Sequence, residues 1–110
     1  MKSQNNIPKT EKVLAADRII HEPARMVILS LLSVVEEADF IFLINQTGLT
    51  QGNLSSHISK LEDAGFIEVI KTFRKKRPRT ILRLTTEGGK KFRSYLDTMQ
   101  SFFDNISPVS

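Results

Sequence analysis

Several residue types and patterns are absent from this chain of 110 residues, and each absence excludes a class of protein. Cysteine is missing, which excludes a disulfide framework, a thiolate metal site and a cysteine nucleophile. No apolar run approaches the roughly 18 to 20 residues that a membrane-spanning helix needs. Residues 1–10 also lack the apolar centre of a signal peptide. We therefore expect a cytoplasmic protein with one small domain.

Catalytic and metal-binding groups are also scarce. His21 and His57 are the only histidines, and neither has metal ligands or a nucleophile and base around it in the sequence. For His21, two residues before Pro23, we expect a structural hydrogen bond, and for His57 a packing or phosphate-facing role. The sequence thus predicts no catalytic residue, no metal site and no cofactor, and the chain is not expected to be an enzyme.

Negative charge is missing from one segment of a chain whose net charge is +4. Residues 71–83 contain no acidic residue and seven basic ones: Lys71, Arg74, Lys75, Lys76, Arg77, Arg79 and Arg83. The rest of the chain holds nine basic residues against all twelve acidic ones, a net charge of −3. Positive charge concentrated in this way predicts a polyanionic partner that is met in one place.

Residues 49–65 read as an amphipathic helix with a polar outer face. Leu54, Ile58 and Leu61 recur at helical spacing, Thr50 is a good N-cap, and Gly65 stands where a helix often ends. The opposite face carries small polar residues in place of residues with higher helix propensity, and it has no arginine. This pattern fits an ordinary serine-rich surface helix, or a helix thin enough to enter a DNA major groove.

The segments before this helix predict further helices. We interpret residues 1–10 as a mobile arm, residues 11–20 as a short helix, and residues 23–35 as the central core helix. Asp39 can cap a third helix that runs to Thr47, and Gly48 ends it. Ile41 and Phe42 on that helix are either half-buried or part of a partner site. The third helix, the turn at 47–50 and the helix at 49–65 form a helix-turn-helix.

After Gly65 the pattern changes to that of strands. Residues 66–71 and 80–84 are rich in β-branched and aromatic residues, so they predict a β-hairpin whose basic loop is residues 74–79. Pro78 cannot donate to a strand ladder, so we place it at the strand edge or in the loop, which it stiffens.

A last helix is predicted to begin after Thr85 or Thr86, with Glu87 in its first turn. Its apolar stripe consists of Phe92, Tyr95, Leu96, Met99, Phe102, Phe103 and Ile106. The preceding domain is too small to cover so long a stripe, so we predict that these residues form a homodimer interface. The alternative is a terminal helix that folds back on its own domain.

The order of motifs resembles that of the small winged helix-turn-helix transcriptional regulators related to the MarR and ArsR families. The similarity covers roughly residues 17–95. It is carried by the motifs HEPAR at 21–25, LTQGNLSSH at 49–57, LEDAGFI at 61–67, RPRT at 77–80 and LTTEG at 84–88.

The resemblance implies an α+β, mainly α, fold with a two-stranded basic wing and a C-terminal dimerisation helix. The implied organisation is an arm at 1–10, a DNA-binding domain at 11–85 and a dimerisation helix and tail at 86–110. It also implies a homodimeric, sequence-specific repressor or activator in a prokaryotic cytoplasm. Many ArsR-like members sense metals through cysteines, which this chain lacks. Many MarR-like members bind a small apolar ligand, but no residue here specifies one, so an effector stays open.

The predicted mechanism uses two surfaces on duplex DNA with a pseudo-palindromic site. The helix would read bases in the major groove, where Asn and Gln can pair with adenine, and the wing would contact phosphates or a narrow minor groove. The predicted DNA-binding residues are Thr50, Gln51, Asn53, Ser55, Ser56, Ser59, Lys60, Arg74, Lys75, Lys76, Arg77 and Arg79. The alternative is a winged-helix module that binds RNA or a protein partner.

Overall fold

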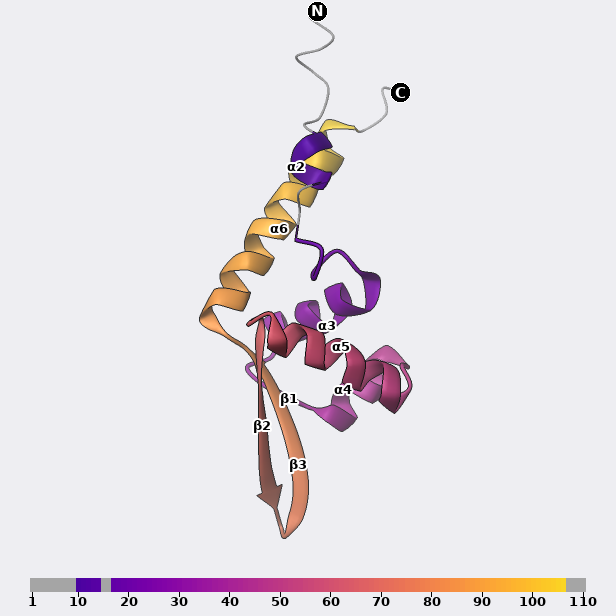
Figure 1. The fold of residues 1–110 in the computed structure, drawn as a ribbon, viewed down its shortest axis with the longest axis vertical. Coiled ribbons are helices and arrows are strands. Elements are labelled where there is room, and N and C mark those ends of the chain that lie inside the picture. The colour runs from indigo at the N-terminus through magenta and orange to yellow at the C-terminus, as the bar shows by residue number, and fades with distance from the viewer. Residues whose placement is uncertain (1–9, 15–16, 107–110) are drawn as a thin grey trace, which may run out of the picture.

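The computed structural model describes residues 10–14 and 17–106. The elements are α2 (Thr10–Leu14), α3 (Pro23–Val34), β1 (Ala38–Asp39), α4 (Phe40–Thr47), α5 (Gln51–Asp63), β2 (Ile67–Arg74), β3 (Arg77–Leu84) and α6 (Thr86–Asn105). β3 lies between β1 and β2 in a three-stranded antiparallel sheet. Helices α3, α4 and α5 gather beside the sheet, while the β2–β3 hairpin and α6 project in opposite directions (Figure 1). This is the predicted α+β, mainly helical, winged helix-turn-helix, with a short strand β1 that the sequence did not predict.

The core lies where α3, α4 and α5 meet the sheet and the first turns of α6. Its buried apolar residues include Ile20, Ile28, Leu29, Leu32, Leu43, Leu54, Ile58, Leu61, Phe66, Ile67, Leu82, Phe92 and Tyr95. On α5 the buried positions are the three of the predicted stripe. On α4, Leu43 is buried, Phe42 packs against the core and Ile41 is 60% exposed. The core therefore uses Phe42 and leaves Ile41 at the surface.

The helix ends agree with the capping residues in the sequence. The Asp39 carboxylate accepts a hydrogen bond from the Phe42 backbone N–H at 2.7 Å, and the Thr50 hydroxyl accepts one from the Asn53 N–H at 3.1 Å. Thr85, not Thr86, is the N-cap of α6. Gly48 and Gly65 have φ angles of 70° and 82°, a region that L side chains rarely adopt.

The predicted helix at 11–20 is wrong in its second half. α2 ends at Leu14, Ala15 and Ala16 lie outside the described residues, and residues 17–20 form a turn. The Asp17 carboxylate accepts a hydrogen bond from the Ile19 N–H at 2.8 Å, a local bond that competes with helix formation. Of the predicted arm, residues 1–9 lie outside the described residues, and Thr10 already belongs to α2.

The predicted six-residue loop of the hairpin is also wrong. The ladder continues to the pair Arg74 and Arg77, so that only Lys75 and Lys76 form the turn. Both turn residues have positive φ angles, 52° and 64°, as a type I′ turn requires. Pro78 lies inside β3, opposite Phe73. Since β1 pairs only with Ile81 and Leu82, Pro78 is on a part of β3 with an open edge and costs no bond to β1.

Candidate nucleic-acid interface

The outer face of α5 is polar and fully accessible. Six of the seven residues predicted to bind DNA from this helix region are exposed side chains on α5, and the seventh, Thr50, is its exposed N-cap. The first turn of α5 contains no acidic residue. The positive end of the helix dipole is therefore not neutralised from within the helix.

A buried arginine holds the inner side of α5, and the sequence analysis missed it. The guanidinium of Arg25 on α3 is 3.2 Å from Nδ1 of His57 on α5, and its Nε donates to the Ile19 carbonyl at 2.5 Å. The Glu22 carboxylate lies 3.7 Å from the same His57 nitrogen. The expected packing role of His57 is thus seen in this cluster, which joins α5 to α3. The burial of Arg25 could have been predicted from its spacing, because it precedes the buried residues Ile28 and Leu29 by three and four positions and so lies on the same face of α3.

The charge of Glu22 is supported by the same cluster. Partial burial raises the pKa of this carboxyl, but hydrogen bonds from the Arg25 and Ala24 backbone N–H groups and the nearby charges of His57 and Arg25 outweigh it. The net pKa of Glu22 is lowered from its ordinary value. Glu22 is therefore ionised at neutral pH and balances the charge of the buried guanidinium.

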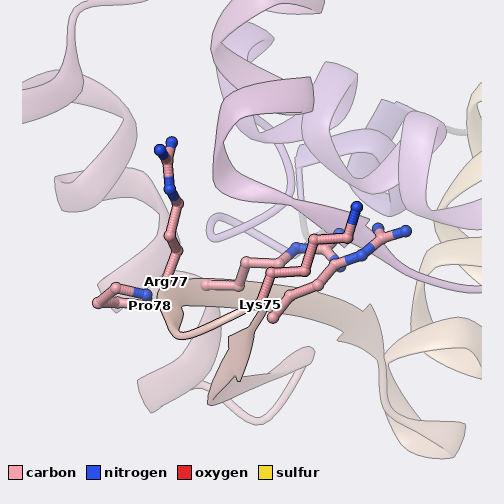
Figure 2. Close-up of a pocket in the computed structure, with 5 residues that line it drawn as sticks. Lys75, Arg77 and Pro78 are labelled. Atoms are coloured by element: carbon pink, nitrogen blue, oxygen red, sulfur yellow. The ribbon is translucent and has the colours of Figure 1, made fainter.

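Positively charged side chains cluster at the free end of the hairpin. An open depression there is lined by Arg74, Lys75, Arg77, Pro78 and Arg79. Figure 2 shows Lys75 and Arg77 extending from this end of the ribbon. Within the described residues, the charges of Arg74, Lys75, Lys76 and Arg77 have no acidic side chain within 4.0 Å. Because Arg74 and Arg77 face each other across the ladder, their repulsion favours an anion between or beside them.

The two arginines of β3 nearer the body, Arg79 and Arg83, are paired with carboxylates. Arg79 donates to Asp39 at 2.9 Å, and Arg83 contacts Glu68 at 2.5 Å and Glu37 at 4.0 Å. The Phe42 N–H bond lowers the pKa of Asp39 most, partial burial opposes it, and Arg79 and Arg74 lower it further. Arg79 was predicted to contact DNA, but in this structure it joins β3 to the start of α4.

The stripe on α6 is divided between the core and the surface. Phe92 and Tyr95 are 2% and 4% exposed, so their prediction as dimer-interface residues is wrong: the chain's own core already covers them. Leu96, Phe103 and Ile106 are 45%, 55% and 46% exposed, and Met99 and Phe102 are partly buried. α2 lies against the far part of α6, away from the rest of the domain (Figure 1).

His21 forms the structural hydrogen bond predicted for it. Its Nδ1 lies 2.8 Å from the hydroxyl of Tyr95 on α6, which also contacts the sulfur of Met26 at 3.1 Å. Burial raises the pKa of the Tyr95 hydroxyl, which therefore stays protonated at neutral pH. This bond ties α6 to the turn before α3.

Comparison with known proteins gives the family. The family model for the winged helix DNA-binding domain matches residues 24–103. An uncharacterized protein of Methanocaldococcus jannaschii is 36% identical over 89 residues, covering 81% of this chain and 97% of the relative. None of the helices in the described part of the chain is long and apolar enough to cross a membrane.

Solved structures of regulators share the fold. A transcriptional regulator homologue from Pyrococcus horikoshii superposes with a TM-score of 0.82 at 29% identity, covering 88% of this chain and 96% of that one. NadR in complex with 4-hydroxyphenylacetate has the same fold, with a TM-score of 0.68 at 24% identity over 96% of this chain and 72% of that one. The predicted winged-helix architecture is confirmed by these comparisons, and the winged helix family is not one of enzymes. This chain belongs to the winged helix DNA-binding domain family.

Proposed function

We propose that this chain is a homodimeric transcriptional regulator that binds specific sequences of double-stranded DNA. In this proposal α5 lies in the major groove, the end of the β2–β3 hairpin contacts phosphates and the minor groove, and α6 pairs with the α6 of a second copy. The observation that carries the proposal is the pairing of two surfaces. One is the accessible, small, polar face on α5, and the other is the end of the adjoining hairpin, where four cations have no carboxylate within 4.0 Å among the described residues.

The α5 face supplies groups that can distinguish bases. Gln51 and Asn53 can each donate to and accept from an adenine edge, which carries both kinds of group in the major groove. The serines at 55, 56 and 59 are small enough to let the helix backbone approach the bases. Thr50 keeps its side-chain oxygen on the Asn53 N–H, so it would offer only its hydroxyl proton to a phosphate.

The hairpin end supplies affinity. Each protomer contributes four cations from Arg74, Lys75, Lys76 and Arg77, hence about eight for a dimer. The logarithm of the DNA-binding constant should therefore fall with the logarithm of the salt concentration with a slope of about −7. Arg79 contributes less in this proposal, because its charge is shared with Asp39. Its role is to hold the base of the hairpin against α4.

The dimer is supported by the length of α6 and the distribution of its apolar residues. The radius of gyration is 17.2 Å, whereas about 13 Å is typical of a compact chain of this length. The far half of α6 projects from the domain with Leu96, Phe103 and Ile106 exposed. A second copy related by two-fold symmetry would cover these side chains and place two α5 helices on one duplex.

The test is selection of bound fragments from a random duplex library, followed by binding measurements on the recovered duplex. We expect a pseudo-palindromic motif. Asn53→Ala should reduce the preference for that motif over random duplex by about tenfold or more. Arg77→Ala should weaken binding to both duplexes alike and reduce the slope of the salt dependence by about one per protomer. Recovery of no motif, or tighter binding to structured RNA than to any duplex, would refute the proposal.

A further inference from the structure

The end of the hairpin has an apolar face that the proposed function does not use. Phe73, the last but one residue of β2, is 74% exposed. Its partner across the ladder is Pro78, which is also exposed. Side chains alternate between the faces of a strand, so Phe73 and Pro78 share one face and Arg74 and Arg77 the other. The free end of the hairpin is therefore amphipathic.

The register of the β2–β3 ladder places the side chains of Phe73 and Pro78 next to each other. The pair Arg74 and Arg77 closes the two-residue turn, so the next pair, Phe73 and Pro78, is of the non-hydrogen-bonded kind, in which opposing side chains lie closest. The proline ring cannot rotate away, and its missing N–H removes no ladder bond at this position. Pro78 thus gives the phenyl ring a rigid neighbour, and the ring meets a partner with little further loss of conformational freedom.

The surroundings of Phe73 indicate what it can dock against. Four cations follow it in the chain, and within the described residues no carboxylate lies within 4.0 Å of them: Arg74, Lys75, Lys76 and Arg77. A partner must therefore carry dense negative charge immediately beside an apolar surface. A DNA minor groove does so, because phosphates border the apolar deoxyribose rings and the edges of the bases, and an opened base step exposes the base faces.

We propose that Phe73, supported by Pro78, is an apolar wedge that enters the minor groove and partly opens one base step while the surrounding cations bind the flanking phosphates. This inference rests on the proposed binding to duplex DNA. Apolar side chains inserted in this way unstack a base step and kink the duplex. Pyrimidine–purine steps such as TA and CA open most easily, so the wedge adds sequence preference at a position that α5 does not reach.

The wedge is tested on the duplex selected by the wild-type protein, labelled at both ends with a fluorescence donor and acceptor. A second version of the duplex carries 2-aminopurine, whose fluorescence rises when it unstacks, at the step beneath the hairpin. The variants are Phe73→Ala, Phe73→Leu, which keeps an apolar wedge, and Arg77→Ala, which removes a neighbouring charge. Since Phe73 is exposed, both substitutions at this position should leave the thermal unfolding temperature almost unchanged.

We expect Phe73→Ala to weaken binding by about tenfold, in line with the loss of one aromatic stacking contact. It should also reduce the bend and the 2-aminopurine signal and leave the slope of the salt dependence unchanged. Phe73→Leu should restore most of the bend. Arg77→Ala should instead reduce the slope and retain the unstacking signal at saturating protein.

The outcomes separate this inference from the proposed function. If the wild-type protein binds no duplex, the proposed function fails. If it binds, and Phe73→Ala binds, bends and unstacks DNA as the wild type does, only the wedge is refuted. If Phe73→Ala changes sedimentation of the free protein and leaves the DNA signals intact, a second copy of the chain covers Phe73, and the wedge is again refuted.

Discussion

Gly88 is the residue that sets how closely α6 approaches the rest of the domain. The Thr85 N–H donates to the Phe66 carbonyl at 3.0 Å, and the Thr85 hydroxyl donates to the Gly65 carbonyl at 2.6 Å. One helical turn later, a Cβ at Gly88 would overlap the backbone of Phe66. Backbone cannot move aside as a flexible side chain can. Glycine is therefore required here by space, not by its conformational freedom.

Gly88→Ala should lower the free energy of unfolding by about 1 to 3 kcal/mol, as overpacking of a tight contact does. The matched control is Gly89→Ala, because a Cβ at Gly89 meets no atom within 4 Å. There, alanine should stabilise the helix by roughly 0.5 to 1 kcal/mol. Urea unfolding of both variants measures the difference, and equal stability of the two would contradict the close contact at Gly88.

Asp39 combines a helix cap with an ion pair, and the two contributions can be separated. Its pKa is lowered in the folded state, so its ionised form stabilises the protein above the unfolded-state pKa of about 3.9. That stability is lost as the pH falls through the lower folded-state pKa. Asparagine keeps the N-cap but removes the charge that holds Arg79.

Asp39→Asn should lower the free energy of unfolding by less than about 1 kcal/mol at pH 7, which is typical of the loss of a partly exposed ion pair. Asp39→Ala should cost about 1 kcal/mol more, because the cap is lost as well. In urea unfolding between pH 7 and pH 2, the asparagine variant should show a smaller acid-induced loss of stability than the wild type. A loss as steep as that of the wild type would assign the acid sensitivity to other groups, Glu22 among them.

Residues that act locally were the ones that sequence reasoning could identify. Asp39, Thr50 and Gly65 mark helix ends through bonds to backbone a few positions away, and all three do so in the structure. The spacing of Arg25 could have indicated its burial, but its contact with His57 and that of Arg79 with Asp39 were missed because they join residues 32 and 40 positions apart. Such pairs become visible only when the fold brings the segments together.

At the scale of elements, α3, α4 and α5 were predicted well because apolar periodicity and capping residues agree. β1 was missed because two residues carry no periodicity, and the strand exists through its pairing with β3. The hairpin loop was predicted too long because Pro78 and a run of cations look like a loop. Pro78 and the cations are tolerated on β3 because this part of the strand does not pair with β1. The β2–β3 ladder therefore continues to a two-residue turn.

The turn at Lys75 and Lys76 carries backbone strain that a better turn sequence would remove. Both lysines adopt positive φ angles, which cost about 1 kcal/mol or more for a residue with a Cβ. Asparagine followed by glycine is the preferred pair for this turn. In place of the preferred turn residues, the two lysines add two positive charges to the end of the hairpin.

The double variant Lys75→Asn, Lys76→Gly should raise the free energy of unfolding by about 1 kcal/mol and weaken DNA binding. Its salt dependence should be less steep by about two per protomer. The control is Lys75→Gln, Lys76→Gln, which removes the same charges and keeps the strain. It should weaken binding equally without a gain in stability. Wild-type affinity in either double variant would show that the turn does not contact DNA.

At the scale of the whole molecule, the position of α6 decides which apolar residues of its stripe stay exposed and which are covered by the core. The stripe is continuous in sequence, so its periodicity could not show where the domain stops covering it. The structure places that limit after Tyr95, because the core ends there and α6 continues outward beside α2. The predicted dimer surface is thereby reduced to Leu96, Met99, Phe102, Phe103 and Ile106, with Met99 and Phe102 already partly covered.

Leu96→Glu combined with Ile106→Glu should convert the dimer to monomers, because burying two carboxylates in an apolar interface costs more than the interface can supply. The control is Ser94→Glu with Ser101→Glu, which adds the same charge at exposed positions on the opposite side of α6. Sedimentation equilibrium should show monomers for the first variant and dimers for the second. A monomer presents one hairpin and one α5 to the duplex, so the slope of its salt dependence should fall to about half. Monomers that keep the full slope and the full affinity would mean that each protomer binds DNA independently and that α6 has no part in binding the operator.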